Sequence, residues 1–510
     1  MNPFKWLKDL FFPAKTPQVA EKAGEEEKIP EHAEQASREE TREIPGEPEK
    51  TVHPKKRPGP ITARKADTIR IWAGVDFGTS FTKVAYKVLG GSRQVFPAPI
   101  SSIPEMPYAV PSLLAFDGRK VLYGDEADSF LSDKPWNEGV RYMKILFAGD
   151  VDEDYKDDDL DTRFREYCDA QVLNASLMNP GYMVSAYLAW VFRRIKSRLG
   201  KKYRAENVLF NFNICLPIDT FEKSNVRREF QRAVNVAMSI EKEWDGDSGL
   251  DLLSKAASQW RSATDLEKEG ATVHLVPEAV AQMASYVNSL SAENKIHGVV
   301  DLGAGTTDFS IFNLCDDDEE GKCVYWYNAI TFPGGMEKVE SSVARLFGKN
   351  SQPISYPRLQ QVMANVAREK DEIRLEVKNQ LERIWEKSRF LAWGPAYGKK
   401  KKESEWKREK VKIFVCGGGS GLPYVEEIFG RCWYEESWGP YEVVTLFAPS
   451  DFGGRPEDFS RLSVAYGLTF PRPELQKYVL PKDCPDQTPE PLPRIADPDG
   501  SWGPVYADIH

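Results

Sequence analysis

The chain has 510 residues, a formal net charge of −10 and a hydrophobic content of 41%, with 13 Trp, 20 Tyr and 26 Phe as core material. This length and composition predict more than one packed domain and exclude a chain that is disordered throughout. The acidic balance argues against a general nucleic-acid-binding protein, because neutralising phosphates requires a dominant basic surface. The seven cysteines form no CxxC pair and the five histidines add no metal-ligand spacing, so no zinc site is expected and a reducing compartment is favoured.

Residues 1–13, MNPFKWLKDLFFP, predict a short amphipathic helix that ends at its final proline. One half of its helical wheel carries Phe4, Trp6, Leu7, Leu10 and Phe11. Such a face suits a membrane surface or a groove on an unidentified partner protein. No run approaches about 18 apolar residues, so no integral membrane span is expected. The start also lacks the apolar core of a signal peptide, which predicts a cytoplasmic location, peripheral to a membrane at most.

Residues 14–67 contain little but Glu, Lys, Arg, Pro and Ala and predict a disordered linker. The folded part is expected over residues 68–470, followed by a Pro-rich tail at 471–510. An acidic run at residues 150–161 alternates as a calcium-binding loop does, but the position that needs Gly holds Tyr155 and the last position holds Asp161. A solvated acidic loop is therefore predicted there.

One pattern occurs twice in the chain. Residues 71–88, IWAGVDFGTSFTKVAYKV, and residues 297–314, HGVVDLGAGTTDFSIFNL, each read as a strand, an Asp-x-Gly turn and a second strand. The turn glycines Gly78, Gly303 and Gly305 allow backbone N–H groups to approach an anion closely. Two such hairpins facing each other would close around the phosphates of a nucleotide.

The polar side chains of the two turns fit this interpretation. Hydroxyls that can donate to phosphate oxygens are carried by Thr79, Ser80, Thr306 and Thr307. Asp76 and Asp301 stand at equivalent positions and could hold a hydrated Mg²⁺ from opposite sides. The competing interpretation is that Asp76, Asp301 and Asp308 only cap turns, which is a common role of Asp.

A third glycine-rich element lies at residues 411–430, VKIFVCGGGSGLPYVEEIFG. It reads as a buried strand, a glycine loop and a helix start, which together make an anion or nucleotide site. A dinucleotide fingerprint is excluded for GAGTTD at 303–308, because Asp308 replaces the third Gly and a strand follows. No GK[ST] follows a glycine loop, which excludes a Walker-type P-loop.

Together these motifs resemble those of the ATPase superfamily that contains actin, the sugar kinases and the heat-shock protein 70 chaperones. VDFGTS at 75–80 and VVDLGAGTTD at 299–308 match its two phosphate motifs, and VCGGGSGLP at 415–423 matches its adenosine motif. Residues 276–287 and 460–470 look like its two connecting helices. The resemblance implies an α/β, two-lobed actin-like ATPase fold of duplicated ribonuclease H-like domains with a nucleotide cleft between the lobes. Lobe I would comprise about 68–290 and 455–470, and lobe II about 291–454.

The heat-shock protein 70 branch is the most similar, and it implies roles for particular residues. Asp76 and Asp301 would organise Mg²⁺ and the attacking water, Lys144 would be the catalytic lysine, Glu278 would reach a metal-bound water and Thr306 would contact phosphate. The nucleotide would be lined by Gly78, Thr79, Ser80, Phe81, Gly303, Gly305, Thr306, Gly334, Gly335, Lys370, Gly417, Gly418 and Gly419. Lys144 and Glu278 also have simpler interpretations. A lysine in an amphipathic stretch usually faces water, and a Glu at a helix start can merely favour the helix dipole.

The chain also departs from this branch. Glu278 is followed by Ala279 where the family has Glu-Pro, and Gly421 stands where the chaperones carry an Arg at the adenine. The Pro-rich remainder after residue 470 is too short for a client-peptide domain. The resemblance implies an Mg²⁺-dependent ATPase whose lobe closure signals to a partner protein. The alternatives are a filament-forming actin homologue, a small-molecule kinase and a non-hydrolysing ATP-binding adaptor.

Overall fold

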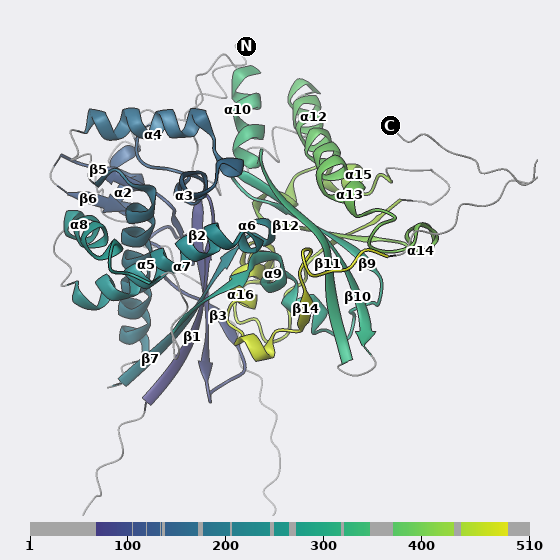
Figure 1. The fold of residues 1–510 in the computed structure, drawn as a ribbon, viewed down its shortest axis with the longest axis horizontal. Helices are drawn as coiled ribbons and strands as arrows, with labels where there is room; N and C mark the ends of the chain where they lie inside the picture. Colours follow the sequence, from purple (N-terminus) through teal and green to yellow (C-terminus); the bar gives the residue numbers. More distant parts are fainter. Residues whose placement is uncertain are drawn as a thin grey trace, which may run out of the picture. The chain divides into compact units, whose positions relative to one another are not determined.

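The computed structural model describes residues 68–487 except 105, 119, 133, 135–137, 172–176, 204–206, 245–248, 265–271, 318–320, 347–370 and 433–439. It is a mixed α/β fold built on two six-stranded sheets (Figure 1). The amphipathic helix predicted at 1–13, the linker at 14–67, Lys370 and the end of the tail lie outside the described residues.

The first sheet has the strand order β3-β2-β1-β7-β8, and β4 pairs with β2. β1 is antiparallel to β2 and parallel to β7, which is parallel to β8. β1 lies in the middle of the sheet, and its last residues are buried on both faces. The strands are β1 (Thr68–Phe77), β2 (Phe81–Leu89), β3 (Val95–Pro97), β4 (Ala109–Pro111), β7 (Asn207–Leu216) and β8 (Val273–Pro277).

The second sheet repeats this arrangement. Its order is β13-β12-β9-β10-β11-β14, so that β11-β10-β9-β12-β13 matches the first sheet strand for strand. β9 is antiparallel to β10 and parallel to β12. The strands are β9 (Ile296–Leu302), β10 (Thr306–Asp317), β11 (Gly321–Pro333), β12 (Lys412–Cys416), β13 (Glu442–Thr445) and β14 (Lys477–Val479). β14 pairs with β11 and extends the fold past residue 470, into the predicted tail.

Helices cover both sheets. The long α5 (Pro180–Tyr203) is buried almost all round over its first half, and it packs with α7 (Ser224–Glu243) in the core of the first sheet. A small sheet of β5 (Leu114–Phe116) and β6 (Val121–Tyr123) lies beside this core. The other helices of this part are α2 (Asp125–Leu131), α3 (Met143–Val151), α4 (Asp158–Ala170), α6 (Ile218–Glu222) and α8 (Gly249–Trp260). On the second sheet lie α10 (Met336–Leu346), α12 (Asp371–Ser388), α13 (Gly394–Ala396), α14 (Glu403–Arg408) and α15 (Val425–Phe429).

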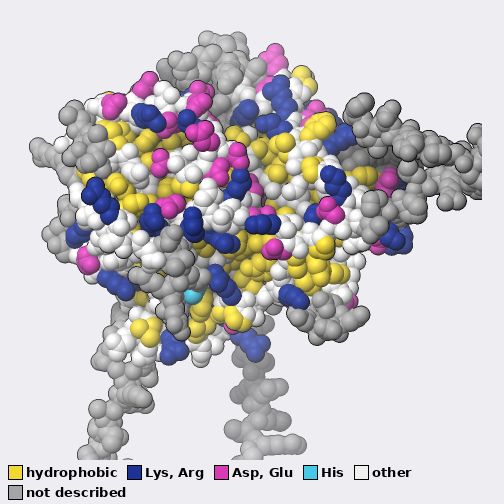
Figure 2. Space-filling view, viewed as in Figure 1, with side chains coloured by type: hydrophobic (Ala, Val, Ile, Leu, Met, Phe, Trp, Pro, Cys, Tyr) yellow, Lys and Arg dark blue, Asp and Glu magenta, His cyan; other side chains and the backbone are white. Residues whose placement is uncertain are grey.

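The sequence predicts a solvated loop for the acidic run at 150–161, but the structure differs from this prediction. The run ends α3, forms a short 3-10 turn, η1 (Glu153–Tyr155), and begins α4. Asp157 caps α4 by accepting from the backbone N–H of Leu160 at 3.0 Å. The acidic residues that follow favour the helix start through the dipole, and Figure 2 shows Asp and Glu side chains gathered over α4.

Two helices lie between the sheets, α9 (Glu278–Val287) and α16 (Phe459–Gly467) (Figure 1). They pack directly on each other because Gly467 has no side chain, and a Cβ there would overlap the carbonyl oxygen of Ala281. Gly74 in β1 allows the same close approach to Ala465 of α16. A hydrophobic cluster that includes Ala85 of β2 and Phe414 of β12 continues from one sheet to the other around these helices. No helix in the described part of the chain has the length and apolar character needed to cross a membrane.

Candidate functional site

A cavity of ≈ 200 Å³ lies where the β1–β2 and β9–β10 turns meet. The first hairpin lines it with Asp76, Gly78, Thr79 and Lys83, and the second with Asp301, Gly303, Thr306 and Asp308. Lys144 of α3 and Glu278 of α9 also line it. The strand register explains this arrangement, because Asp76 stands opposite Lys83 in one hairpin and Asp301 stands opposite Asp308 in the other. The fold therefore brings residues from four separate stretches of sequence to one cavity.

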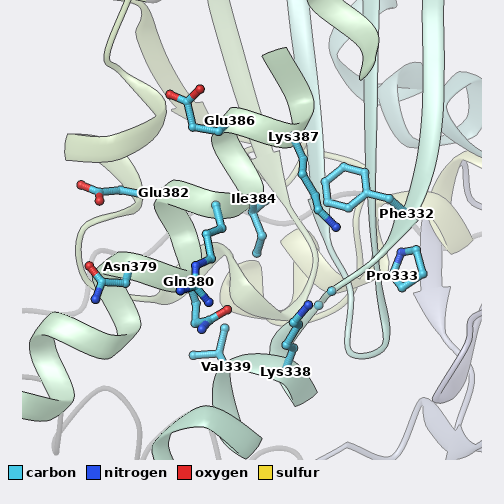
Figure 3. Close-up of a pocket in the computed structure, with 13 residues that line it drawn as sticks. Phe332, Pro333, Lys338, Val339, Asn379, Gln380, Glu382, Ile384, Glu386 and Lys387 are labelled. Atoms are coloured by element: carbon cyan, nitrogen blue, oxygen red, sulfur yellow. The ribbon is translucent and has the colours of Figure 1, made fainter. Parts of the chain in front are cut away.

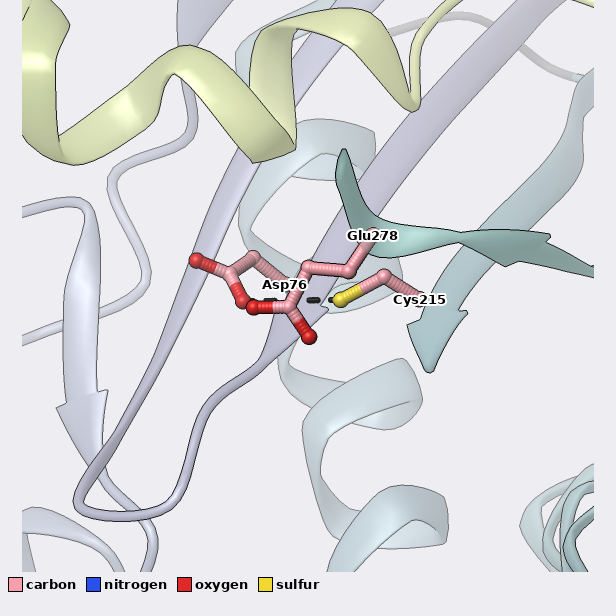
Figure 4. A group of neighbouring side chains, drawn as sticks. All are labelled: Asp76, Cys215 and Glu278. Carbon is pink, nitrogen blue, oxygen red and sulfur yellow. Dashed lines mark hydrogen bonds between the residues drawn. The ribbon is translucent and has the colours of Figure 1, made fainter. Parts of the chain in front are cut away.

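Asp76 precedes the first turn, and its side chain is buried, with 1% of the residue surface exposed. One of its oxygens accepts from Lys83 Nζ at 2.6 Å, and the other lies 3.6 Å from Cys215 Sγ. Figure 4 shows Asp76, Cys215 and Glu278 converging, with one ligand atom of each within 4.8 Å of the others. Burial raises the pKa of Cys215 well above its usual range, so the thiol is protonated and the two carboxylates are the natural ligands of a hard cation.

Lys144 and Glu278 form a buried ion pair, with Lys144 Nζ 2.9 Å from Glu278 Oε2. Burial alone would lower the pKa of Lys144, but Glu278 and other acidic groups nearby raise it above its usual value. Lys144 is therefore a charged group inside the cavity, and the alternative of a solvent-facing lysine is wrong. Glu278 is the first residue of α9 and uses its side chain for this pair, so favouring the helix dipole is not its whole role.

The carboxylates of the second hairpin, Asp301 and Asp308, are partly buried. Burial raises the pKa of Asp301 to about 7, with Lys83 acting against the shift and Glu278 adding to it. Burial, and Glu278 after it, raise the pKa of Asp308 well above its usual range. Gln282 Nε2 donates to Asp301, and Thr331 Oγ1 donates to Asp308. Asp308 lies within β10 and faces the cavity, so it does not merely cap a turn.

The charges in the cavity do not balance. The lining holds more carboxylates than ammonium groups: six of the former, from Asp76, Asp154, Asp157, Glu278, Asp301 and Asp308, and three of the latter, from Lys83, Lys144 and Lys156. Burial is the main cause of the raised pKa of Asp301 and Asp308, and Glu278 adds to both shifts through its negative charge. A divalent cation would offset the excess negative charge, and the oxygen-rich donor set fits Mg²⁺. Asp76 and Glu278 would hold such an ion directly or through water, with Asp301 close behind.

The two turns touch each other. Thr79 Oγ1 and Thr306 Oγ1 are 3.3 Å apart, and a Cβ on Gly305 would lie 3.0 Å from the methyl carbon of Thr79. Ser80 Oγ donates to Glu337 Oε1 at 2.7 Å. Thr307 is fully buried and donates to the carbonyl oxygen of Gly334 at 2.8 Å, so its hydroxyl has a structural partner.

The other predicted nucleotide contacts surround the second turn. Gly334 N–H donates to Gly305 O at 3.2 Å, and Gly335 packs against the carbonyl oxygens of residues 303 and 304. Gly417 has φ +78 and lies so close to Asp301 that a side chain would overlap that carboxylate. Gly418 and Gly419 follow in a 3-10 turn, η4 (Gly418–Gly421), with Gly419 packed on Leu302. These glycines bring three backbone segments together behind Asp301 without lining the cavity itself.

Phe81 lies next to the first turn, and its contact with a nucleotide stays a prediction. It begins β2 and packs against the hydrophobic cluster shared by the sheets, and it lines neither of the two cavities next to the turns. A nucleotide contact from Phe81 would have to come from its backbone.

A second cavity, of ≈ 450 Å³, lies between the end of β11, α10 and α12. Phe332 and Pro333 line both cavities and form the wall between them. Figure 3 shows the amines of Lys338 and Lys387 extending toward the same space, whereas the carboxylates of Glu382 and Glu386 point away from it. Burial and the nearby Lys338 lower the pKa of Lys387. This cavity has a basic interior beside the Gly334–Gly335 turn.

The sequence analysis did not single out Lys83, which lines the first cavity, or several residues that contact the side chains of the two turns. Lys83 follows Asp76 by the spacing that an antiparallel hairpin places side by side, and Gln282 follows Glu278 by one helical turn, so both had a detectable signal. Cys215, Tyr142 and Glu337 had none, because only tertiary packing brings them near the turns.

Comparison with protein-family models finds no match for this chain, and comparison with curated proteins finds none either. The functional conclusion is therefore drawn from the geometry and charge of the site.

Proposed function

We propose that this protein is an Mg²⁺-dependent ATPase of the two-lobed, actin-like type, most similar to the heat-shock protein 70 nucleotide-binding domain. The observation that carries the proposal is the cavity at the meeting point of two equivalent hairpins, with Asp76 and Asp301 at matching positions. The phosphates of ATP would lie between the turns, and closure of the lobes about α9 and α16 would signal to a partner protein.

The repeated topology supports this proposal. A duplicated ribonuclease H-like domain would produce two sheets with the same strand order and directions, which is the relation between β3-β2-β1-β7-β8 and β11-β10-β9-β12-β13. It would also place one helix of each half at the crossing between the lobes, as α9 and α16 are placed. The close contact at Gly467 would make this crossing the pivot.

The side chains of the cavity can divide the work of phosphoryl transfer to water. A bound Mg²⁺ would neutralise charge on the phosphate oxygens. Lys144 and Lys83 would stabilise the charge that spreads over the transferred group, and backbone N–H groups of the turns would add to this. Asp301, whose pKa of about 7 lies near the working pH, suits a group that orients water and accepts its proton.

The test compares ATP turnover with ATP occupancy. Wild-type protein, Asp76→Asn and Asp301→Asn are assayed for phosphate release and for bound nucleotide, with the exposed Asp169→Asn on α4 as the matched control. We expect the two cavity variants to lose turnover by about 10²-fold or more, because groups that hold a metal or position water act mainly on the chemical step. Wild-type turnover in Asp301→Asn would contradict the site assignment. Bound ATP without turnover in the wild-type protein would instead indicate the non-hydrolysing adaptor.

A further inference from the structure

Glu337 makes a contact that crosses from one half of the fold to the other. It lies in the first turn of α10, on the side of the second sheet. Its Oε1 accepts from Ser80 Oγ at 2.7 Å, and its Oε2 accepts from the hydroxyl of Tyr142. Ser80 belongs to the β1–β2 turn and Tyr142 immediately precedes α3. One carboxylate thus ties the second half to two elements of the first.

The surroundings of Glu337 are built to hold it. Its backbone N–H donates to Ala304 O at 2.9 Å, which anchors it to the β9–β10 turn. Tyr142 adopts φ 56, a left-handed backbone conformation that is strained for a non-glycine residue. Burial raises the pKa of Glu337, although Tyr142, Ser80 and the nearby Arg141 act in the opposite direction. The backbone strain of Tyr142 and the desolvation of Glu337 both cost free energy, so the surrounding fold must hold these two residues in contact.

The contact with Glu337 also occupies a hydroxyl that, by the resemblance of the first turn to a phosphate motif, would bind a phosphate: Ser80 directly follows Thr79, which lines the cavity. The Ser80 hydroxyl has one proton, which it can donate to Glu337 or to a phosphate oxygen but not to both. A carboxylate beside a phosphate is also repelled, because the two groups carry the same charge. The direct contact of Thr79 with Thr306 leaves the turns closed at the same point.

We infer that Glu337 competes with the phosphate of the nucleotide for Ser80, so that the Glu337 contact and a phosphate between the two turns exclude each other. This inference rests on the proposed function for the identity of the ligand. Glu337 would be a positioning residue: it holds the Ser80 hydroxyl and would have to release it when a phosphate chain binds between the turns. The affinity measured for a nucleotide would then include the work of breaking this contact.

The experiment measures equilibrium binding of MgATP and of magnesium tripolyphosphate to full-length protein by calorimetry. The variants are Glu337→Gln, which removes the charge, and Glu337→Ala, which removes the acceptor as well. The matched control is Glu372→Gln, on an exposed position of α12. We expect both Glu337 variants to bind about tenfold more tightly than the wild-type protein and the control to be unchanged.

The coupling energy between Ser80 and Glu337 distinguishes the inference from a purely structural role of Glu337, because a purely structural contact would persist when the ligand binds. A double-mutant cycle of Ser80→Ala and Glu337→Ala in urea unfolding should show coupling without ligand and none with saturating MgATP. Unchanged affinities, or coupling that persists with ligand, would overturn the inference and leave the ATPase proposal standing. Tighter tripolyphosphate binding by the variants, without ATP hydrolysis by the wild-type protein, would support the inference and contradict the ATPase. If neither ligand binds any of the proteins, both are wrong.

Discussion

The charged form of Asp301 is the form that the proposed chemistry needs, but it is also the form that lowers the stability of the folded protein. The pKa of Asp301, about 7, lies above the ordinary value of 3.8 because the residue is buried beside other acidic groups. A group with a raised pKa contributes its full stability below pH 3.8 and loses it as the pH rises through 7. Above that pH the folded protein holds a buried charge that the unfolded chain would leave in water.

Asp301→Asn is therefore expected to stabilise the metal-free protein while it removes turnover. At pH 8 the free energy of unfolding should rise by about 1–4 kcal/mol, since each pKa unit corresponds to about 1.4 kcal/mol. At pH 4 the gain should be small. Urea unfolding in the presence of a chelator at both pH values checks this, with Asp169→Asn as the control. A variant that is less stable than the wild-type protein at pH 8 would show that the charge of Asp301 is compensated.

The pKa of His297 is lowered, whereas that of Asp301 is raised, so the two residues change stability with pH in opposite directions. His297 is fully buried in β9, its ring is stacked on Phe312 at 4.7 Å, and its Nε2 lies 2.9 Å from the Tyr286 hydroxyl. Burial, with Lys295 and Lys412 nearby, lowers its pKa to about 3 from 6.5. A lowered pKa contributes stability that is present above pH 6.5 and lost as the pH falls toward 3.

Replacing this residue should flatten the acid dependence of stability. His297→Phe keeps an aromatic ring in the stack and has no proton to gain. Between pH 7 and pH 5 the wild-type protein should lose about 2 kcal/mol more than the variant. Urea titrations of both proteins at the two pH values measure the difference. Equal losses would mean that His297 does not govern acid sensitivity in this range.

At the scale of elements, the crossing of α9 and α16 depends on the absence of one side chain. Gly467→Ala would drive a Cβ into the Ala281 carbonyl, and backbone on both sides prevents a local adjustment. We expect a loss of at least about 3 kcal/mol in unfolding, together with reduced nucleotide binding, because the helices must separate. Gly200→Ala in α5 is the control: no atom lies within 4 Å of the new Cβ, and it should gain up to about 1 kcal/mol. Equal stability of the two variants would contradict close packing at this crossing.

At the scale of the whole molecule, a nucleotide that bridges both turns should protect both halves together. Saturating MgATP at about 100 times Kd should stabilise the bound form by about 2.7 kcal/mol. Hydrogen exchange should then slow in residues 76–80 and 301–307 at once. Protection confined to one turn would show that the ligand does not lie between them.

The helix predicted at residues 1–13 lies outside the described residues, and its docking role stays a prediction. Deleting 1–13 is expected to reduce liposome flotation or partner pull-down while ATP turnover is unchanged, because the linker that the sequence predicts at 14–67 would separate the two functions. Equal behaviour of the full and shortened proteins in both binding assays would remove the docking role.

The sequence by itself determined the features that depend on local pattern. The hairpin turns at Asp76 and Asp301 and the strand before Gly417 follow from hydrophobic periodicity and turn chemistry within short segments, and the helix that begins at Glu278 follows from the resemblance to the family's connecting helix. Their duplication also indicated that the turns belong to equivalent places in two sheets. These inferences need no knowledge of distant contacts, since strand and turn propensities act over a few residues.

Only the tertiary structure decided what meets these turns. Glu337 is 257 residues from Ser80 along the chain, and Cys215 is 139 residues from Asp76, so no local pattern relates the members of either pair. The burial that raises the pKa of Asp301 likewise depends on α9 and the Gly417 loop packing around it. Long-range packing is set by the shape and burial of whole elements, and for this reason the charge state of the site appears only once the chain is folded.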